Sequence, residues 1–316
     1  MKPYWQGVFP AVTTQMHRDG TIDLESTARH LEVLIDSGVG GLVMCGSLGE
    51  NQSLDGDEKR AVVEAAVAVV AGRIPVLSGV AETSTEAARR FVKDCRRLGA
   101  DGFMVMPAMA YRGDEREVLG HLRAVAKETD APLMIYNNPI AYANDVTPRM
   151  FAKLAEIDTI VALKESSDNT RRITDLRNEV GDRFALFTGV DDLALESAVL
   201  GIDGWVAGIG LAFPYENQRL WDLTREGKWD EARKLYRWYT PLLHLDVSTK
   251  LVQNIKLAMQ ETGLGTEWVR PPRLQLMGAE RARVLGIIHE GIATRPKLPG
   301  SARGKRSRGH DKPRTR

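Results

Sequence analysis

The feature that most constrains this chain is a regular alternation, over residues 7–207, of short apolar segments with longer amphipathic ones. The short segments are rich in Val, Ile and Leu, as strands buried on both faces of a sheet are. They cover residues 7–14, 41–45, 74–80, 102–106, 133–136, 160–164, 184–188 and 204–207. Strands that alternate with helices predict a parallel sheet, and a count of eight favours the closed (β/α)8 TIM barrel of the α/β class over an open doubly wound sheet.

The expected helices lie between these strands, and the pattern changes after the eighth strand. Helical spacing covers residues 23–37, 56–71, 84–98, 114–128, a segment opened by Thr147 and Pro148, 169–179 and 191–200. Beyond residue 207 only helical segments follow, at 214–226, 229–243, 248–262 and 278–292. Because a barrel needs one closing helix, we expect residues 1–225 to form the barrel, 226–293 a helical C-terminal appendage, and 294–316 a basic, disordered tail.

Composition narrows the class of protein. With 316 residues and 43% hydrophobic content, the chain can bury a sizeable core. Seven of its Lys and Arg side chains lie in residues 301–316 with one acid, so the rest is mildly acidic, which does not suggest nucleic-acid binding. The tail alone could contact nucleic acid or an anionic membrane, but such an end is more often a solvated extension.

The cysteines and the apolar segments indicate the compartment. Cys45 and Cys95 do not make a disulfide framework, and no apolar segment is long enough to span a membrane or resembles a signal region. We therefore expect a cytoplasmic protein that does not enter a membrane.

Lys164 stands at the end of the expected strand 160–164, where a (β/α)8 barrel places its catalytic residues. Burial would disfavour the charged form of its amine and lower the pKa. A neutral amine is a nucleophile toward carbonyl and imine carbons. The alternative is that Lys164 simply ends the strand and reaches solvent or pairs with a carboxylate, as lysines usually do.

Tyr136 ends the expected strand 133–136 in the same way, so two reactive side chains should share one site. A phenol with an ordinary pKa of about 10 needs a hydrogen-bonded neighbour or a cation to act as a base. Ser47 and protonated Lys164 are the candidates. Otherwise Tyr136 is a buried tyrosine with a satisfied hydroxyl. Asn138 precedes a proline, is expected in a turn, and is a candidate substrate contact.

Residues 46–50, Gly-Ser-Leu-Gly-Glu, follow the second expected strand. The glycines permit a tight turn, and successive backbone N–H groups in such a loop can bind an anion. Ser47 adds a hydroxyl donor, so Ser47, Leu48 and Gly49 are candidate contacts for a substrate carboxylate. The alternative is an ordinary turn between a strand and a helix.

Gly189, Asp191 and Asp192 lie where the seventh expected strand ends. One of the aspartates could hold a substrate hydroxyl, and either could instead cap the following helix. The six histidines show no metal-binding spacing, and the chain has neither a phosphate-binding Gly-Lys-Ser/Thr loop nor a dinucleotide-binding glycine pattern. We therefore expect neither a metal nor an organic cofactor.

Three of these segments together resemble one family. Residues 46–50 are similar to the Gly-Thr-Thr-Gly-Glu loop of the dihydrodipicolinate synthase and N-acetylneuraminate lyase family. Residues 136–139, Tyr-Asn-Asn-Pro, resemble its Tyr-Asn-x-Pro segment, and residues 164–167, Lys-Glu-Ser-Ser, resemble its Schiff-base lysine segment. The order and the spacing agree over residues 7–292.

The resemblance implies class I aldolase-like chemistry on a small carboxylate, without a cofactor. It implies a Schiff base on Lys164, Tyr136 as proton shuttle, and Ser47 as carboxylate holder and relay. It also implies a homotetramer built as a dimer of tight dimers.

Departures from the family pattern bear on the substrate. The lysine-pathway synthase has an arginine two residues after the proline, where this chain has Ala141. Its Pro-Tyr-Tyr segment, which lends a tyrosine to the neighbouring subunit, is here Pro-Ala-Met at residues 107–109. Leu48 replaces the second threonine, and Gly208 stands where sialic-acid-type contacts would need a serine. These differences argue against both activities.

Residues 136–139, 188–192 and 244–256 resemble the hydroxyproline-catabolic branch, Δ1-pyrroline-4-hydroxy-2-carboxylate deaminase. This resemblance implies a lyase that dehydrates and deaminates that compound to 2,5-dioxopentanoate (2-oxoglutarate semialdehyde) and ammonia. The alternatives are a sugar-acid dehydratase or a 2-oxo-acid (pyruvate) aldolase on the same lysine. From another class, the alternative is a regulatory or nucleic-acid-binding homologue that acts through the basic tail.

Overall fold

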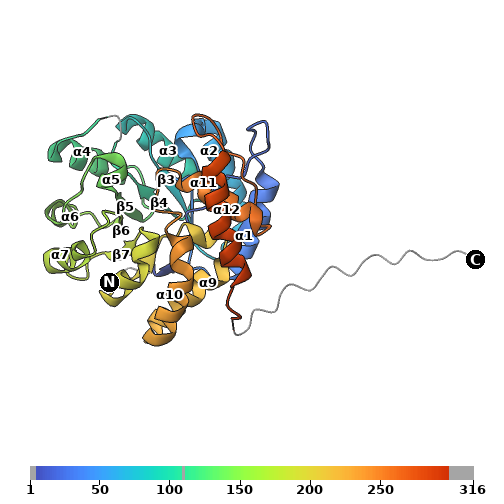
Figure 1. Cartoon of the computed structure of the whole chain (residues 1–316). Coiled ribbons are helices and arrows are strands. Elements are labelled where there is room, and N and C mark those ends of the chain that lie inside the picture. The colour runs from blue at the N-terminus through green and yellow to red at the C-terminus, as the bar shows by residue number, and fades with distance from the viewer. Residues whose placement is uncertain (1–4, 109–110, 299–316) are drawn as a thin grey trace, which may run out of the picture.

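The computed structural model describes residues 5–108 and 111–298, and its centre is a sheet of eight parallel strands (Figure 1). The spatial order is β1-β8-β7-β6-β5-β4-β3-β2. The strands are β1 (Gly7–Val8), β2 (Leu42–Met44), β3 (Val76–Val80), β4 (Gly102–Val105), β5 (Leu133–Asn137), β6 (Ile160–Glu165), β7 (Ala185–Thr188) and β8 (Gly204–Trp205). A parallel bridge joins Ala11 to Val43, so the first and last strands of this order meet and the sheet curls into the expected (β/α)8 barrel.

Helices surround the strands in Figure 1. They are α1 (Leu24–Asp36), α2 (Gly56–Val70), α3 (Thr85–Arg97), α4 (Glu115–Ala126), α5 (Pro139–Tyr142), α6 (Pro148–Leu154), α7 (Arg171–Val180), α8 (Ala194–Val199) and α9 (Pro214–Arg225). Short 3₁₀ helices η1 (Asn51–Ser53), η2 (Asp191–Leu193) and η3 (Ile209–Leu211) follow β2, β7 and β8. Local signals explain where many of the helices begin. Asp55 and Asp114 each form a capping box with the glutamate three residues later, and Thr147 caps α6 before Pro148.

The elements that differ from the sequence-based expectation include β1 and the segment after β5. Strand β1 is shorter than residues 7–14, because the chain beyond Val8 bonds alternately to both neighbours. The N–H of Phe9 donates to the Trp205 oxygen at 2.8 Å, and that of Val12 donates to the Val43 oxygen at 2.9 Å. The expected turn after β5 is instead the one-turn helix α5, because the Asn138 side chain accepts from the Ala141 N–H at 2.9 Å.

The C-terminal part consists of α10 (Trp229–Leu243), α11 (Leu251–Glu261) and α12 (Gly278–Ala293). Helix α12 packs on both α10 and α11, and α10 also packs against α9. One hydrophobic core is continuous from barrel residues such as Phe187 to Ile288 of α12. The division into residues 1–225 and 226–293 therefore stays a prediction. Most of the tail expected at 294–316 lies outside the described residues, from 299 onward.

Aromatic side chains pack inside the barrel. The rings of Phe9 and Phe187 meet edge to face, with centroids 5.2 Å apart. Trp205 on β8 is fully buried on the opposite face of the sheet, because it pairs in register with Thr188, the residue after Phe187. The carboxyl ends of β5, β6 and β7 open at one end of the barrel. There the segment between α10 and α11 meets them, so that both parts of the chain line one cavity.

Candidate active site

Lys164 lies at the carboxyl end of β6, in register with Tyr136 on β5 and Phe187 on β7. The residue is 6% exposed, and its Nζ lies 4.0 Å from the centre of the Tyr136 ring. Burial lowers the pKa of Lys164, although the charge of Asp246 opposes that shift. Lys164 neither reaches solvent nor forms an ion pair with any carboxylate of the described residues. A buried amine with a lowered pKa is what a nucleophilic lysine requires.

Gly189, just after β7, makes room for this lysine. A Cβ at Gly189 would lie 2.1 Å from Lys164 Cε and 2.2 Å from Ser166 Oγ, far inside van der Waals contact. A side chain at this position would therefore displace the amine. The lack of a side chain at Gly189 therefore leaves the space that Lys164 occupies.

Tyr136 is buried beside Lys164, and its hydroxyl accepts a hydrogen bond from Asn138 Nδ2 at 3.0 Å. Burial raises the pKa of the phenol, while the Asn138 donor favours the phenolate and acts against that shift. The phenol is therefore protonated at neutral pH. It can donate a proton first and, once ionised, act as a strong base.

Ser47 hydrogen-bonds through its Oγ to the hydroxyl of Tyr142, the last residue of α5. Burial raises the pKa of Tyr142 to about 12, so this phenol too is protonated at neutral pH. The rings of Tyr142 and Tyr136 meet edge to face with centroids 6.0 Å apart. The two phenols and Ser47 thus form a compact hydroxyl cluster beside the lysine.

The loop that carries Ser47 is anchored from beneath by a buried ion pair. Glu50 Oε1 lies 2.6 Å from the Nζ of Lys256 on α11, and both side chains are fully buried. The second Glu50 oxygen accepts from the Arg270 N–H at 3.0 Å. The carbonyl of Gly49 accepts from Thr14 Oγ1 at 2.8 Å. Because several elements hold this loop, Ser47 is presented by a rigid support.

A cavity of about 550 Å³ opens above these groups at the mouth of the barrel. Of the residues expected from the sequence, it is lined by Ser47, Leu48, Tyr136, Asn138, Lys164 and Gly189. Gly49 does not line it. The structure therefore brings six of the nine candidate residues to one cavity.

The other two candidates, Asp191 and Asp192, interact with other residues of this chain. Asp191 accepts from Trp205 Nε1 at 2.9 Å and from the backbone N–H groups of Gly208 and Ile209 at 2.8–3.1 Å. Burial raises the pKa of Asp191 to about 6 despite these donors. Asp192 lies 2.8 Å from His244 Nδ1. Neither lines the cavity, so the hydroxyl-binding role proposed for one of them has no support in this geometry.

Among the functional groups that were not expected from the sequence and also line the cavity are Tyr142, Asp246 and Arg273. Tyr142 follows the Tyr-Asn-Asn-Pro segment by three residues, which is a sequence signal that could have pointed to it. Asp246 lies within residues 244–256, the segment that resembles the deaminase branch. Arg273 lies between α11 and α12 with no motif around it, and Nη1 is 3.3 Å from Ser53 Oγ.

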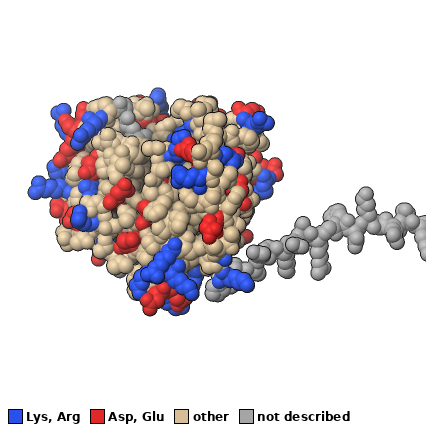
Figure 2. All heavy atoms as spheres, viewed as in Figure 1, with Lys and Arg blue, Asp and Glu red and all other residues tan. Residues whose placement is uncertain are grey.

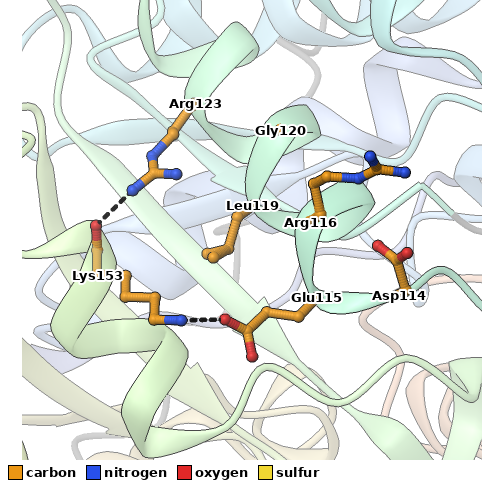
Figure 3. A pocket seen from close by; sticks show the side chains of 7 residues that line it. All are labelled: Asp114, Glu115, Arg116, Leu119, Gly120, Arg123 and Lys153. Atoms are coloured by element: carbon orange, nitrogen blue, oxygen red, sulfur yellow. Dashed lines mark hydrogen bonds and ion pairs between the residues drawn. The ribbon is translucent and has the colours of Figure 1, made fainter.

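A second hollow of about 660 Å³ lies on the outside, between α4 and α6 (Figure 3). Two of its cations are engaged locally: Lys153 pairs with Glu115, and Arg123 Nη2 donates to the Lys153 carbonyl at 3.0 Å. It holds no buried nucleophile. The face shown in Figure 2 carries cations and anions interspersed, without the basic stripe that nucleic-acid binding uses.

Across 5–108 and 111–298, no group of His, Cys, Asp and Glu side chains is arranged to hold a metal ion. Among the helices within those limits, none combines the length and the apolar character needed to cross a bilayer.

Comparisons with known proteins show similarity over nearly the whole chain. Residues 4–290 match the model of the dihydrodipicolinate synthetase family. A 4-hydroxy-tetrahydrodipicolinate synthase from Pelobacter propionicus is 31% identical over 287 residues, which are 90% of this chain and 98% of that protein. The crystal structure of dihydrodipicolinate synthase from Aquifex aeolicus superposes with a TM-score of 0.86 at 28% identity, covering 90% of this chain and 98% of that one. A prophage protein of the same family from E. coli K12, solved in complex with pyruvate, gives a TM-score of 0.86 at 26% identity, with 92% and 99% covered.

Proposed function

The chain belongs to the dihydrodipicolinate synthetase family, whose lyases are of the Schiff-base, class I aldolase type, and from that premise we propose that Lys164 forms a Schiff base with C2 of a small carboxylate substrate. The observation that carries the proposal is the buried amine of Lys164, packed 4.0 Å from the ring centre of Tyr136 at the mouth of the barrel. An iminium at this position acts as an electron sink, so neighbouring carbon atoms become acidic.

The substrate that we propose is Δ1-pyrroline-4-hydroxy-2-carboxylate. Ala141, at the position of the synthase's arginine, lines the cavity without a charge. The cation at the cavity is instead Arg273, which also lowers the pKa of the neighbouring Tyr142, against the dominant effect of burial. Arg273 and Ser47 therefore offer the substrate carboxylate a site made within one chain. Met109 of the altered Pro-Ala-Met segment lies outside the described residues.

The reaction begins when the neutral amine of Lys164 attacks C2 of the cyclic imine. The bond from C2 to the ring nitrogen then breaks, and Tyr136 gives its proton to that nitrogen as it leaves. The resulting phenolate removes a proton from C3, and the C4 hydroxyl departs as water. The amine on C5 tautomerises to an imine. Hydrolysis of this imine and of the bond to Lys164 yields ammonia and 2,5-dioxopentanoate.

Protons can reach and leave Tyr136 through hydroxyl groups of this chain alone. Ser47 is bonded to Tyr142, and Asn138 orients the Tyr136 phenol. Tyr142 thus offers, within one subunit, the second phenol that the resembled synthase takes from a neighbouring one. We propose a cytoplasmic homotetramer on the family resemblance, with a hydroxyl relay that is complete in each chain.

A single panel of substrates tests the proposed function. The purified protein is incubated with Δ1-pyrroline-4-hydroxy-2-carboxylate, with 4-hydroxy-2-oxo acids, and with pyruvate plus aspartate semialdehyde. Ammonia and pyruvate are followed by coupled dehydrogenase assays. We expect ammonia and 2,5-dioxopentanoate from the pyrroline, and none with Lys164→Ala as control.

Other outcomes would replace the proposal. Pyruvate release without ammonia would favour the aldolase alternative, and dehydration of a sugar acid would favour the dehydratase. Condensation with aspartate semialdehyde would favour the activity after which the relatives are named. The non-enzyme alternative predicts no turnover, together with nucleic-acid retention on filters that is lost when residues 299–316 are deleted.

A further inference from the structure

Asp246 enters the cavity from outside the barrel, in the turn that follows α10. Its carboxyl group lies against Gly208, just after β8. A Cβ built at Gly208 would come within 2.2 Å of Asp246 Oδ1 and 2.7 Å of its Cγ. Any residue larger than glycine at 208 would therefore push this carboxyl group away. The sequence has Gly208 where sialic-acid-type contacts would need a serine. The space that a side chain at 208 would take is occupied by the carboxyl group of Asp246, which comes from the C-terminal part.

The carboxyl group of Asp246 is available to a substrate. It lines the cavity together with Lys164, and no described residue donates a hydrogen bond to it. Its acidic neighbours differ in this respect, because Asp191 is held by Trp205 and two backbone N–H groups, and Asp192 is paired with His244. A fourth acid, Asp168, lines the cavity only from its exposed rim. Asp246 is therefore the acid placed to meet bound substrate.

The electrostatic setting favours the protonated form of Asp246. Burial raises the pKa of this carboxyl group well above its ordinary value, and the charge of Asp191 raises it further. Lys164 opposes the shift, with Asp192 adding a smaller increase. Lys164 and Asp246 influence each other's pKa and both line the cavity, but they do not form an ion pair with each other.

Taking the proposed function as its premise, we propose that Asp246 is the catalytic acid that protonates the C4 hydroxyl as it leaves the Lys164-bound substrate, and that Gly208 admits it. The bond from C4 to oxygen breaks, and its electron pair stays with the oxygen, which takes the carboxyl proton and departs as water. The electrons of the enamine form a double bond between C3 and C4 and restore the iminium at C2. The Asp246 carboxylate then recovers a proton from C5, which the conjugated iminium has made acidic.

The protonation state of Asp246 decides between two reactions of the bound substrate, which are cleavage of the bond between C3 and C4 and loss of the C4 hydroxyl as water. A carboxylate beside the C4 hydroxyl would remove its proton and cleave the bond between C3 and C4, as an aldolase does. A carboxylic acid there protonates the hydroxyl and eliminates it. The site therefore selects 2-imino or 2-oxo acids with a hydroxyl on C4, and directs them to lose water.

The test compares the full-length wild type with Asp246→Asn, which keeps the shape of the side chain. With Δ1-pyrroline-4-hydroxy-2-carboxylate, we expect ammonia release by the variant to fall about 10²–10⁴-fold, the usual loss when general acid catalysis is removed. The adduct trapped on Lys164 by borohydride should still form. Its mass should be greater by one water than that of the dehydrated wild-type adduct.

A second substrate separates an acid from a merely structural residue. A 4-chloro analogue loses chloride, which needs no proton, so Asp246→Asn should turn it over at nearly the wild-type rate. Gly208→Ala should resemble Asp246→Asn on the hydroxyl substrate. Asp230→Asn on the exposed start of α10 is the matched control and should behave as wild type.

Equal losses on both substrates, or no loss on the hydroxyl substrate, would overturn the role of Asp246. If the wild type released no ammonia from the pyrroline, the proposed function would fail separately. The same pair of proteins would then be compared on a 4-hydroxy-2-oxo acid. Loss of dehydration with the Lys164 adduct retained would support the acid, whereas undiminished dehydration or wild-type cleavage between C3 and C4 would overturn it.

Discussion

Replacing Gly189 by alanine should disable the enzyme by moving Lys164 while the fold stays intact. Gly189 does not have a positive φ, so its backbone conformation is open to alanine. The new Cβ would lie 2.1 Å from Lys164 Cε, whereas ordinary contacts begin at 3.4 Å. The amine must therefore retreat by roughly 1 Å or more, and a misplacement of that size costs on the order of 10²-fold in rate. This loss corresponds to about 2.7 kcal/mol of transition-state stabilisation.

The assay measures kcat/KM for ammonia release, the fraction of Lys164 trapped by borohydride, and the Tm of the variant. Gly286→Ala in α12 is the matched control, because its Cβ would meet nothing within 4 Å. This control should keep full activity and gain up to about 1 kcal/mol of stability from the better helix former. Wild-type kcat/KM and full trapping in Gly189→Ala would refute the view that Gly189 positions the amine.

Three further predictions concern the relay, the loop anchor and pH. Tyr142→Phe removes the hydroxyl that is hydrogen-bonded to Ser47 and should lower kcat on the order of 10²-fold. Borohydride should still trap substrate on Lys164 in this variant. An unchanged kcat would show that Tyr142 is not part of the relay. Glu50→Gln leaves the buried Lys256 without its partner charge and should lower the free energy of unfolding, measured in urea, by about 3–5 kcal/mol. Adding Lys256→Met to this variant should restore part of that loss. A double variant that loses as much stability as the two single variants together would contradict the pairing. Burial lowers the pKa of His30 to about 4 from its ordinary 6.5, so the unfolded chain binds a proton at higher pH than the folded one. The free energy of unfolding should therefore fall by about 1.4 kcal/mol per unit as pH drops from 6.5 toward 4, relative to His30→Leu; parallel pH profiles would speak against a neutral, buried His30.

The barrel could be predicted because its signals are local. Each strand is a short apolar run, each helix shows its own spacing, and a count of eight together with the parallel rule fixes the topology. The same rule explains why Lys164, Tyr136 and Ser47 could be predicted to meet. Tyr136 and Lys164 lie near the carboxyl ends of their strands and Ser47 lies just beyond the end of β2, and parallel strands in a barrel bring their carboxyl ends to one mouth.

The rest of the site depends on packing that periodicity does not encode. Asp246 reaches the cavity because the C-terminal helices fold back over the barrel, which no local pattern specifies. Tyr142 depends on the single turn of α5, a segment in which the sequence indicated only a turn. The hydrogen bonds that Asp191 accepts could not be predicted, because their donors, Trp205 and Gly208, come from the next strand and the loop beyond it.

The most direct test of the central claim is to find which atom holds the substrate during turnover. The wild type is treated with borohydride while it converts Δ1-pyrroline-4-hydroxy-2-carboxylate, and its peptides are then weighed. We predict one stable adduct, on the peptide that contains Lys164, and none in Lys164→Ala. Unmodified Lys164 recovered from an enzyme that is still turning over, or an adduct on a different lysine, would contradict the account.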